Sequence, residues 1–307
     1  MCGLFGFLNY SNNKIKNLSD LTNSLAEQSE VRGTDATGIA FNSKGKLKIL
    51  KESLPAHKIA FKHDDNILAL IGHDRHSTSG FRGVQNHHPF KGKIKDSQFA
   101  LAHNGVLTND IKLRKQLNLP KTKIETDSYI AVQLLERKKK LDFDSIKYMA
   151  ETVEGSFSFS ILDDKNNIYL VKGDSPLCIL HFEKLGIYVF ASTAEILYKA
   201  LIEFPLTFDS IRKGEYSEVE ITEGGVLKIN SNGTVEKSKF NYSFYQGKNW
   251  WDYGCYGYEE EEDEYLRDLI SVAAYLGYSD QDIKHLRNCG YSYEEIEEAL
   301  YEMTIEV

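Results

Sequence analysis

Short apolar runs recur along the first 240 positions of the chain, separated by polar residues and glycines. In the segment SFSFSIL, alternation at Phe157, Phe159 and Ile161 predicts a strand with one buried face. The segments GIAFN and KLKIL flank a turn at residues 43–45 and predict two antiparallel strands. Further strands are expected at residues 1–10, 66–72, 98–103, 167–171, 177–182, 187–192, 216–221 and 224–229.

Helical periodicity occurs in four places between and around these strands. The first helix is expected at residues 18–28, with Ser19 as its N-cap. A second is expected to follow Thr126, its N-cap, and two more are expected at residues 144–153 and 193–201. The apolar residues that share one face in the first two helices are Leu21, Leu25, Ala26, Ile130, Ala131, Leu134 and Leu135.

The order of these elements predicts the fold class. Strands follow one another in groups, and no regular alternation of strand and helix is present, which argues against a doubly wound parallel sheet. We therefore expect an α+β domain over residues 1–240, in which packed antiparallel sheets carry their helices on the outside.

The pattern changes after residue 240. Residues 241–264 have many aromatic and then many acidic residues without periodicity, which predicts a linker that either docks on the main domain or stays loosely ordered. In residues 265–307, two Gly-Tyr-Ser steps, at Gly277 and Gly290, predict a helix end followed by a serine N-cap. We expect a small all-α extension of three helices, at residues 265–276, 280–288 and 293–303.

Charge is spread unevenly along the chain. The formal net charge is −8, yet residues 259–307 alone hold 15 acidic and 3 basic residues. The acidity thus belongs to the predicted extension, which makes its helices a candidate docking element for the body or a partner.

Cysteine usage and hydropathy indicate the cellular setting. The four cysteines form no C-x-x-C pair and no regular framework, as expected of free thiols in a reducing compartment. The N-terminal run LFGFL is too short for a signal-peptide core, and no apolar stretch is long enough to span a membrane. We expect a soluble, cytoplasmic protein.

The most reactive side chain of the chain lies at its start, in the sequence MCGLFGF. A small second residue permits removal of Met1, after which Cys2 carries a free α-amine with a pKa near 8. That amine is suited to take the proton of its own thiol, so one residue supplies both nucleophile and base. The alternative is an ordinary buried cysteine.

Three downstream segments hold candidate substrate-binding groups. In GHDRHSTSG, Arg75 follows a predicted strand, with Thr78 beside it, and is suited to bind a carboxylate; the alternative is a surface arginine. In AHNGVLTN, Asn104 and Gly105 form either a plain hairpin turn or an oxyanion hole. In ETDSY, Asp127 in the first turn of a helix either stabilises the helix dipole or holds a substrate ammonium group.

Two further groups of residues complete the candidates. In VRGTDATG, Arg32, Gly33 and Asp35 form either an ordinary turn or a support for the N-terminal strand. Histidines gather between residues 73 and 103, but His73 and His76 are three apart near a strand end and point to opposite faces. No cysteine or acidic ligand set accompanies them, so we expect no metal site.

Taken together, MCGLFG, RGTDATG, GHDRHSTSG, NHHPF, AHNGVLTN and ETDSY resemble the class II glutamine amidotransferase domain, the N-terminal-cysteine group of the Ntn hydrolases. The resemblance covers about residues 1–235, in family order and at similar spacing. The motif forms look closest to glucosamine-6-phosphate synthase-like and small stand-alone members. It implies a four-layer αββα sandwich of two antiparallel sheets, no cofactor, and hydrolysis of L-glutamine through a γ-glutamyl thioester.

The resemblance also implies a role for each matching residue. Cys2 is the nucleophile, and Asn104 with Gly105 forms the oxyanion hole. Arg75, helped by Thr78, binds the glutamine α-carboxylate, and Asp127 binds the α-ammonium group. The remaining assignments are His76 in substrate binding and Arg32, Gly33 and Asp35 in support.

Departures from the family pattern concern what surrounds the site. His76 stands where the sugar-phosphate synthases carry tryptophan, and Tyr129 where many members have glutamate, which bears on loop closure over glutamine. The residues after 240 are too few for a synthase domain. Ammonia is therefore released or passed to a separate synthetase-like partner protein; neither nucleic acid nor a membrane is expected as partner.

Two other functions remain open on the sequence. The domain is either an Ntn hydrolase acting on a different amide, such as a γ-glutamyl compound, or a glutamine-sensing regulatory subunit. The intact set of Cys2, Asn104 and Gly105 argues against a subunit with a dead site.

Overall fold

The computed structural model describes residues 2–11, 15–76, 83–95 and 97–242, and the single positions 273, 279, 283 and 296. The chain divides into two compact units, Met1–Tyr245 and Gln246–Val307. Of the predicted extension, only Ala273, Ile283 and Ile296 are described within helices, and all three are buried. The predicted linker lies almost wholly outside the described residues, so the boundaries at 240 and 264 stay predictions.

The described part of the first unit holds two antiparallel sheets. The seven-stranded sheet has the order β11-β9-β10-β1-β4-β2-β3 and the six-stranded sheet the order β13-β12-β8-β7-β6-β5. The strands of the first are β1 (Gly3–Asn9), β2 (Ala36–Ser43), β3 (Lys46–Glu52), β4 (Ala69–Arg75), β9 (Cys178–Phe182), β10 (Ile187–Ala191) and β11 (Ser217–Glu218). The strands of the second are β5 (Phe90–Ile94), β6 (Ser97–Leu107), β7 (Gly155–Asp163), β8 (Ile168–Lys172), β12 (Gly225–Ile229) and β13 (Val235–Lys239).

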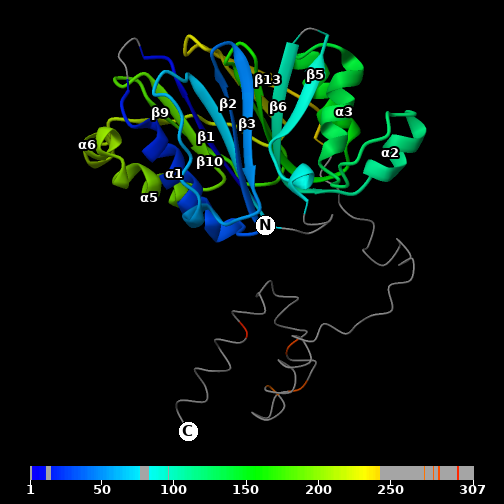
Figure 1. Ribbon diagram of the computed structural model, residues 1–307, viewed down its shortest axis with the longest axis horizontal. Helices are drawn as coiled ribbons and strands as arrows, with labels where there is room; N and C mark the ends of the chain where they lie inside the picture. The colour runs from blue at the N-terminus through cyan, green and yellow to red at the C-terminus, as the bar shows by residue number, and fades with distance from the viewer. Residues whose placement is uncertain are drawn as a thin grey trace. The chain divides into compact units, whose positions relative to one another are not determined.

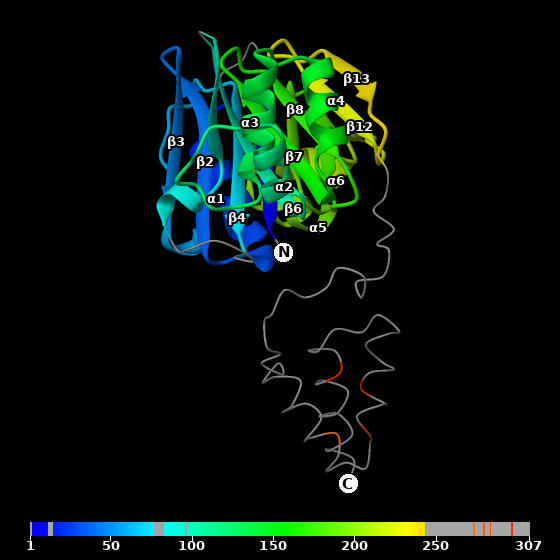
Figure 2. The same ribbon diagram turned by 90° about the vertical axis from the view of Figure 1, so that its right-hand side faces the viewer.

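Helices cover the outer face of each sheet. Figure 1 shows α1, α5 and α6 on one side and α2 and α3 on the other, and Figure 2 shows α3 and α4 across β6–β8. This is the predicted α+β sandwich with four layers in the order αββα. The helices are α1 (Leu18–Ser29), α2 (Asp110–Gln116), α3 (Tyr129–Lys138), α4 (Phe143–Thr152), α5 (Ala194–Glu203) and α6 (Pro205–Lys213), with 3₁₀ turns η1 (Glu30–Arg32), η2 (Ala56–Lys58) and η3 (Val84–Asn86).

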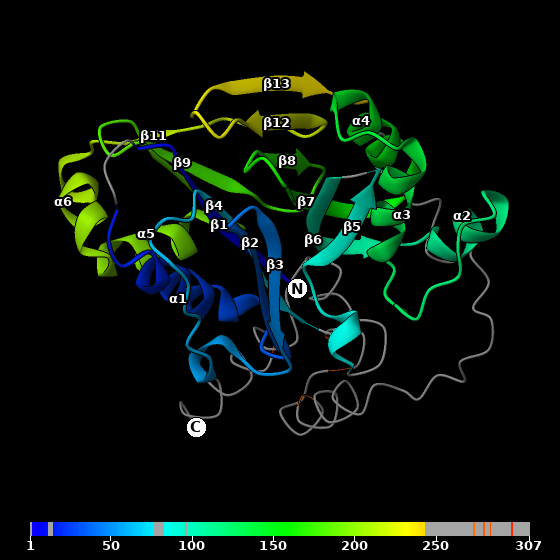
Figure 3. The ribbon, with the colours of Figure 1, turned by 45° about the horizontal axis from the view of Figure 1, so that its top comes forward.

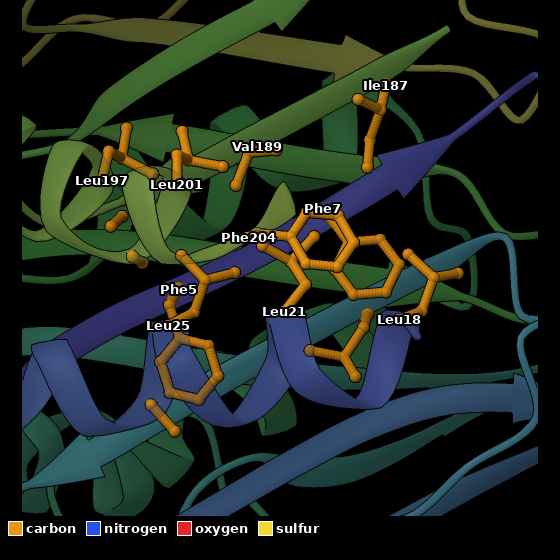
Figure 4. Close-up of a cluster of buried hydrophobic side chains, with 14 of the residues drawn as sticks. Phe5, Phe7, Leu18, Leu21, Leu25, Ile187, Val189, Leu197, Leu201 and Phe204 are labelled. Atoms are coloured by element: carbon orange, nitrogen blue, oxygen red, sulfur yellow. The ribbon is translucent and has the colours of Figure 1, made fainter. Parts of the chain in front are cut away.

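Strand alternation divides the apolar residues among three buried layers. In β1, Phe5 and Phe7 pack against α1 and α5, whereas Leu8 faces the other sheet. In β7, Phe157, Phe159 and Ile161 face α3 and α4, as their alternation predicts. Figure 4 shows the layer beneath α1, built from Phe5, Phe7, Leu18, Leu21, Leu25, Ile187, Val189, Leu197, Leu201 and Phe204.

Local chemistry explains the turn between β2 and β3, and the structure corrects the predicted N-cap of α1. The turn between β2 and β3 has positive φ at both Lys44 and Gly45, the geometry that suits a tight hairpin. The prediction that Ser19 caps α1 is wrong: Asn17 occupies the N-cap, and Ser19 Oγ donates to the His63 carbonyl at 3.1 Å.

Among the described residues, no helix is both long and apolar enough to cross a membrane.

The layer between the sheets is one of three buried apolar layers among the described residues. Leu170 on β8 is fully buried there, paired in register with Ser160 and Leu227. Leu170→Ala should lower the free energy of unfolding by about 2–5 kcal/mol, because the smaller side chain leaves a cavity that the close-packed neighbours fill only in part. Urea unfolding measures the change. Ile111→Ala, at a position 65% exposed, is the control and should shift it by less than about 0.5 kcal/mol; equal losses would contradict this account.

Candidate functional site

Cys2 immediately precedes β1, a central strand of the larger sheet. Because Leu8 faces the inter-sheet layer and side chains alternate along a strand, Cys2 faces that layer too. β1 also contacts β6 of the other sheet, and Figure 3 shows the start of β1 between the two sheets. The Cys2 thiol thus lies where both sheets contribute residues.

The Cys2 thiol is protonated at neutral pH. Burial of the sulfur raises its pKa, and the hydrogen bond to the His76 carbonyl, with 3.5 Å between Sγ and O, and the charge of Arg75 only partly oppose this. The charge of Asp127 raises the pKa further. A nucleophilic role for this thiol therefore requires a base to accept its proton.

Arg75 ends β4, the strand beside β1. The register pairs Gly3 with Asp74, so Arg75 lies next to Cys2 across the strands. Its side chain is 4% exposed, and its Nη1 lies 3.2 Å from His87 Nδ1. Burial lowers the pKa of the guanidinium, and the nearby charges of Cys2, Asp35 and Asp127 raise it. A permanently charged group is thus held close to the thiol.

The RGTDATG segment supports this corner of the sheet. Arg32 Nε donates to the Cys2 carbonyl at 2.8 Å, and the Asp35 N–H donates to the Arg75 carbonyl at 2.9 Å. Gly33 packs against the same backbone: a Cβ there would lie 2.6 Å from the His76 nitrogen, closer than real side chains approach. These contacts fit the expected supporting roles, which stay predictions.

Asn104 and Gly105 lie near the end of β6. The Asn104 side chain is 2% exposed and, like Ala100 four positions earlier, faces the inter-sheet layer. Its Nδ2 is buried without a hydrogen-bond partner among the described residues. A buried donor without an acceptor costs about 1–3 kcal/mol, so this amide is a candidate for binding an acceptor.

The backbone N–H of Gly105 lies at an edge of β6 that no described strand covers. Gly105 is paired in register with Phe157 on β7. The Phe157 N–H donates to Asp174 Oδ1 and its carbonyl accepts from the Gly173 N–H, so both groups point away from β6. The Gly105 N–H therefore points away from β7. On that side β5 pairs with β6 only as far as Leu101, so no described strand takes this N–H. Gly105 has φ +136°, a conformation that favours glycine.

Asp127 lies at the same edge of β6. Its Oδ2 accepts a hydrogen bond from the Leu107 N–H at 2.6 Å, two residues beyond Gly105 and therefore on the same side of the strand. Its Oδ1 accepts from Ser128 Oγ at 3.3 Å. The Asp127 carboxylate is thus held at the same edge of β6 as the Gly105 N–H, for which the described strands supply no acceptor.

The structure corrects the helix predicted around Asp127. α3 begins at Tyr129, so Asp127 is not in its first turn, and Ser128 rather than Thr126 occupies the N-cap position. Ser128 Oγ makes no capping bond and instead lies 2.8 Å from His103 Nδ1. Tertiary contacts to β6 therefore replace the local cap that the sequence predicts.

Three histidines pack together behind the site. The His88 ring lies 4.1 Å from His73 and 6.4 Å from His103 between centroids, and His73 Nε2 lies 2.9 Å from the His103 carbonyl. Burial lowers the pKa of all three, that of His73 to about 3, so they are neutral. Within the described ranges no group of three or more His, Cys, Asp or Glu residues is placed to hold a metal.

For two predicted substrate-binding residues, the described part of the structure shows no side-chain contact with the rest of the site. Thr78 lies outside the described residues. The His76 side chain is exposed, and its contact with Cys2 is made by the backbone carbonyl. From the sequence, no role in the site was assigned to His87, which contacts Arg75, or to Ser128, which contacts Asp127. The only sequence signals for them were the place of His87 in the motif NHHPF and the place of Ser128 directly after Asp127.

Comparisons with known proteins agree with this geometry. Residues 73–199 match the family model described as "Glutamine amidotransferase domain". Glutamine–fructose-6-phosphate aminotransferase [isomerizing] of Staphylococcus epidermidis is 31% identical over 238 residues, 74% of this chain and 38% of that protein. The Staphylococcus aureus enzyme of that name is 30% identical over 243 residues, 75% and 39% of the two chains. The chain thus spans about two fifths of the length of these relatives.

Solved structures show the same fold. The "allosteric regulatory enzyme of purine biosynthesis" aligns with a TM-score of 0.61 at 22% identity, over 79% of this chain and 50% of that one. The glutamine phosphoribosylpyrophosphate amidotransferase of B. subtilis aligns with a TM-score of 0.59, also at 22% identity, over 79% of this chain and 50% of that one. Family model, relatives and fold agree, and the chain therefore carries a glutamine amidotransferase domain of the class II, N-terminal-nucleophile group.

Proposed function

We propose that this domain hydrolyses the side-chain amide of L-glutamine to glutamate and ammonia, with Cys2 as nucleophile. The observation that carries the proposal is the buried Nδ2 of Asn104, which has no hydrogen-bond partner among the described residues, next to Gly105, whose N–H no described strand takes. Two converging donors suit an oxygen that becomes negative during acyl transfer. A thiol next to them completes the requirements for attack on an amide.

The chemistry starts at the amino terminus. Removal of Met1 gives Cys2 a free α-amine, which accepts the thiol proton as sulfur bonds to the amide carbon. Asn104 and Gly105 bind the resulting oxyanion. The protonated amine then gives its proton to the departing nitrogen, so ammonia leaves and a γ-glutamyl thioester remains. Water, deprotonated by the same amine, cleaves the thioester and restores the thiol.

The charged residues around the thiol fit the backbone end of a free amino acid. Arg75 is suited to bind the α-carboxylate through two parallel N–H groups, and Asp127 to bind the α-ammonium group. Both charges act on the Cys2 thiol, Arg75 lowering its pKa and Asp127 raising it, so both groups lie near the proposed nucleophile. Thr78 and His76 are further substrate contacts in this proposal.

The fate of ammonia belongs to the same proposal. We infer that it passes to a separate ammonia-accepting synthetase partner, with the acidic C-terminal helices as a docking element. The support is that residues 259–307 hold 15 acidic and 3 basic residues. The domain limits of 1–240, 241–264 and 265–307 are part of this proposal.

A glutaminase assay tests the function directly. The full chain, with Met1 removal verified by intact mass, should release glutamate and ammonia from L-glutamine, and Cys2→Ala should reduce the rate to background because the nucleophile is gone. Equal rates in both proteins would overturn the proposal. Cleavage of γ-glutamyl compounds but not glutamine would identify a different amide hydrolase, and tight glutamine binding without turnover would identify a sensing subunit.

Asn104→Ala should separate catalysis from stability. Losing one oxyanion donor is expected to lower kcat by about 100- to 1,000-fold. Because the Nδ2 that is lost has no hydrogen-bond partner among the described residues, the free energy of unfolding should fall by less than about 1 kcal/mol. Initial rates and urea unfolding measure the two effects. A kcat within threefold of wild type would show that this amide does not serve the reaction.

The pH dependence should follow the base. Because burial raises the pKa of the Cys2 thiol, the thiol stays protonated and the rate depends on the neutral fraction of the α-amine. We expect kcat/KM to rise about tenfold per pH unit below the amine pKa of about 8 and to level off above it. Initial rates between pH 6 and 9.5 at constant ionic strength measure this. A profile that is flat or falls with rising pH would contradict it.

A further inference from the structure

His87 occupies a bridging position behind the site. It follows η3 and precedes β5, and its residue is 3% exposed. Its Nδ1 lies 3.2 Å from Arg75 Nη1, and its Nε2 lies 2.8 Å from Ser53 Oγ, just beyond β3. Its backbone carbonyl accepts from Lys51 Nζ at 2.6 Å. The ring is therefore held at both nitrogens and at its backbone.

The partners of the ring determine its protonation. An arginine guanidinium has only donors, so Nδ1 of His87 must be the acceptor and the proton must sit on Nε2. The Nε2–H then donates to Ser53 Oγ. Burial, assisted by the charges of Arg75 and Lys51, lowers the pKa of His87 to about 4, consistent with this neutral form.

The neighbour of His87, Asn86, contacts the loop that carries Asp127. Asn86, fully buried, accepts at Oδ1 from the Glu125 N–H at 3.0 Å and donates from Nδ2 to Glu125 Oε2 at 3.2 Å. Glu125 lies two residues before Asp127. One short segment therefore contacts Arg75 and the loop that carries Asp127.

We propose that His87 is a positioning residue, which orients the Arg75 guanidinium through Nδ1 so that the plane of the guanidinium suits the α-carboxylate of glutamine. The inference rests on the proposed function. A guanidinium held before substrate arrives loses less rotational freedom on binding, and a bidentate grip depends on the plane of the fork. His87 itself makes no contact with substrate.

Binding and kinetics in matched variants test this role. His87→Ala should raise the KM for L-glutamine on the order of tenfold with kcat changed less than about threefold. His87→Asn places an amide oxygen near the former Nδ1 and should restore most of the affinity. His181→Ala, on β9 and away from the site, is the histidine control and should leave KM unchanged.

A double-mutant cycle shows whether the effect passes through Arg75. The Kd of glutamine is measured calorimetrically in Cys2→Ala protein, which binds without turnover, with Arg75→Ala and His87→Ala alone and together. The His87 effect should vanish once Arg75 is absent. An equal effect with and without Arg75, or a loss of thermal stability with no change in Kd, would overturn the positioning role.

The same measurements keep the two proposals apart. If Cys2→Ala protein binds no glutamine and wild-type protein hydrolyses none, the proposed function fails and the inference fails with it. If wild-type protein binds and hydrolyses glutamine while His87→Ala has unchanged KM and Kd, only the inference is overturned.

Discussion

Backbone pairing between β1 and β4 is the constraint on which the site depends. Hydrogen bonds across these central strands place Gly3 opposite Asp74, and this register brings Cys2, directly before β1, beside Arg75, the last residue of β4. A slip of one residue would turn every side chain of β1 to the opposite face. The large apolar residues on both faces of β1 make such a slip costly, so the core of the fold also fixes the position of Cys2.

The second sheet contributes by leaving part of one strand unpaired. β5 pairs with β6 only as far as Leu101, and beyond it the edge of β6 carries backbone groups that take partners other than strands. The His103 carbonyl and Leu107 N–H are taken by His73 and Asp127, with Gly105 between them. Polar groups that a neighbouring strand would otherwise satisfy here bind side chains from β4 and from the loop before α3.

The sequence predicts the regular parts of this structure and misses those set by distant contacts. The alternation in SFSFSIL and the turn at Lys44–Gly45 are local signals, and both are confirmed. The cap at Thr126 is wrong because Ser128 bonds to His103 instead of capping α3. The motif residues Cys2, Asn104 and Gly105 are recognisable from sequence. The role proposed for His87 depends on its contact with Arg75, 12 positions earlier in the sequence. No periodic pattern in the sequence indicates that contact.

The place of Cys2 directly before a central strand has a practical consequence for handling the protein. An affinity tag or fusion partner joined to the amino terminus would convert the nitrogen of Cys2 into an amide, which cannot accept a proton at neutral pH. Recombinant protein intended for activity measurements should therefore carry any tag at its other end, or have an N-terminal tag cleaved to leave cysteine first.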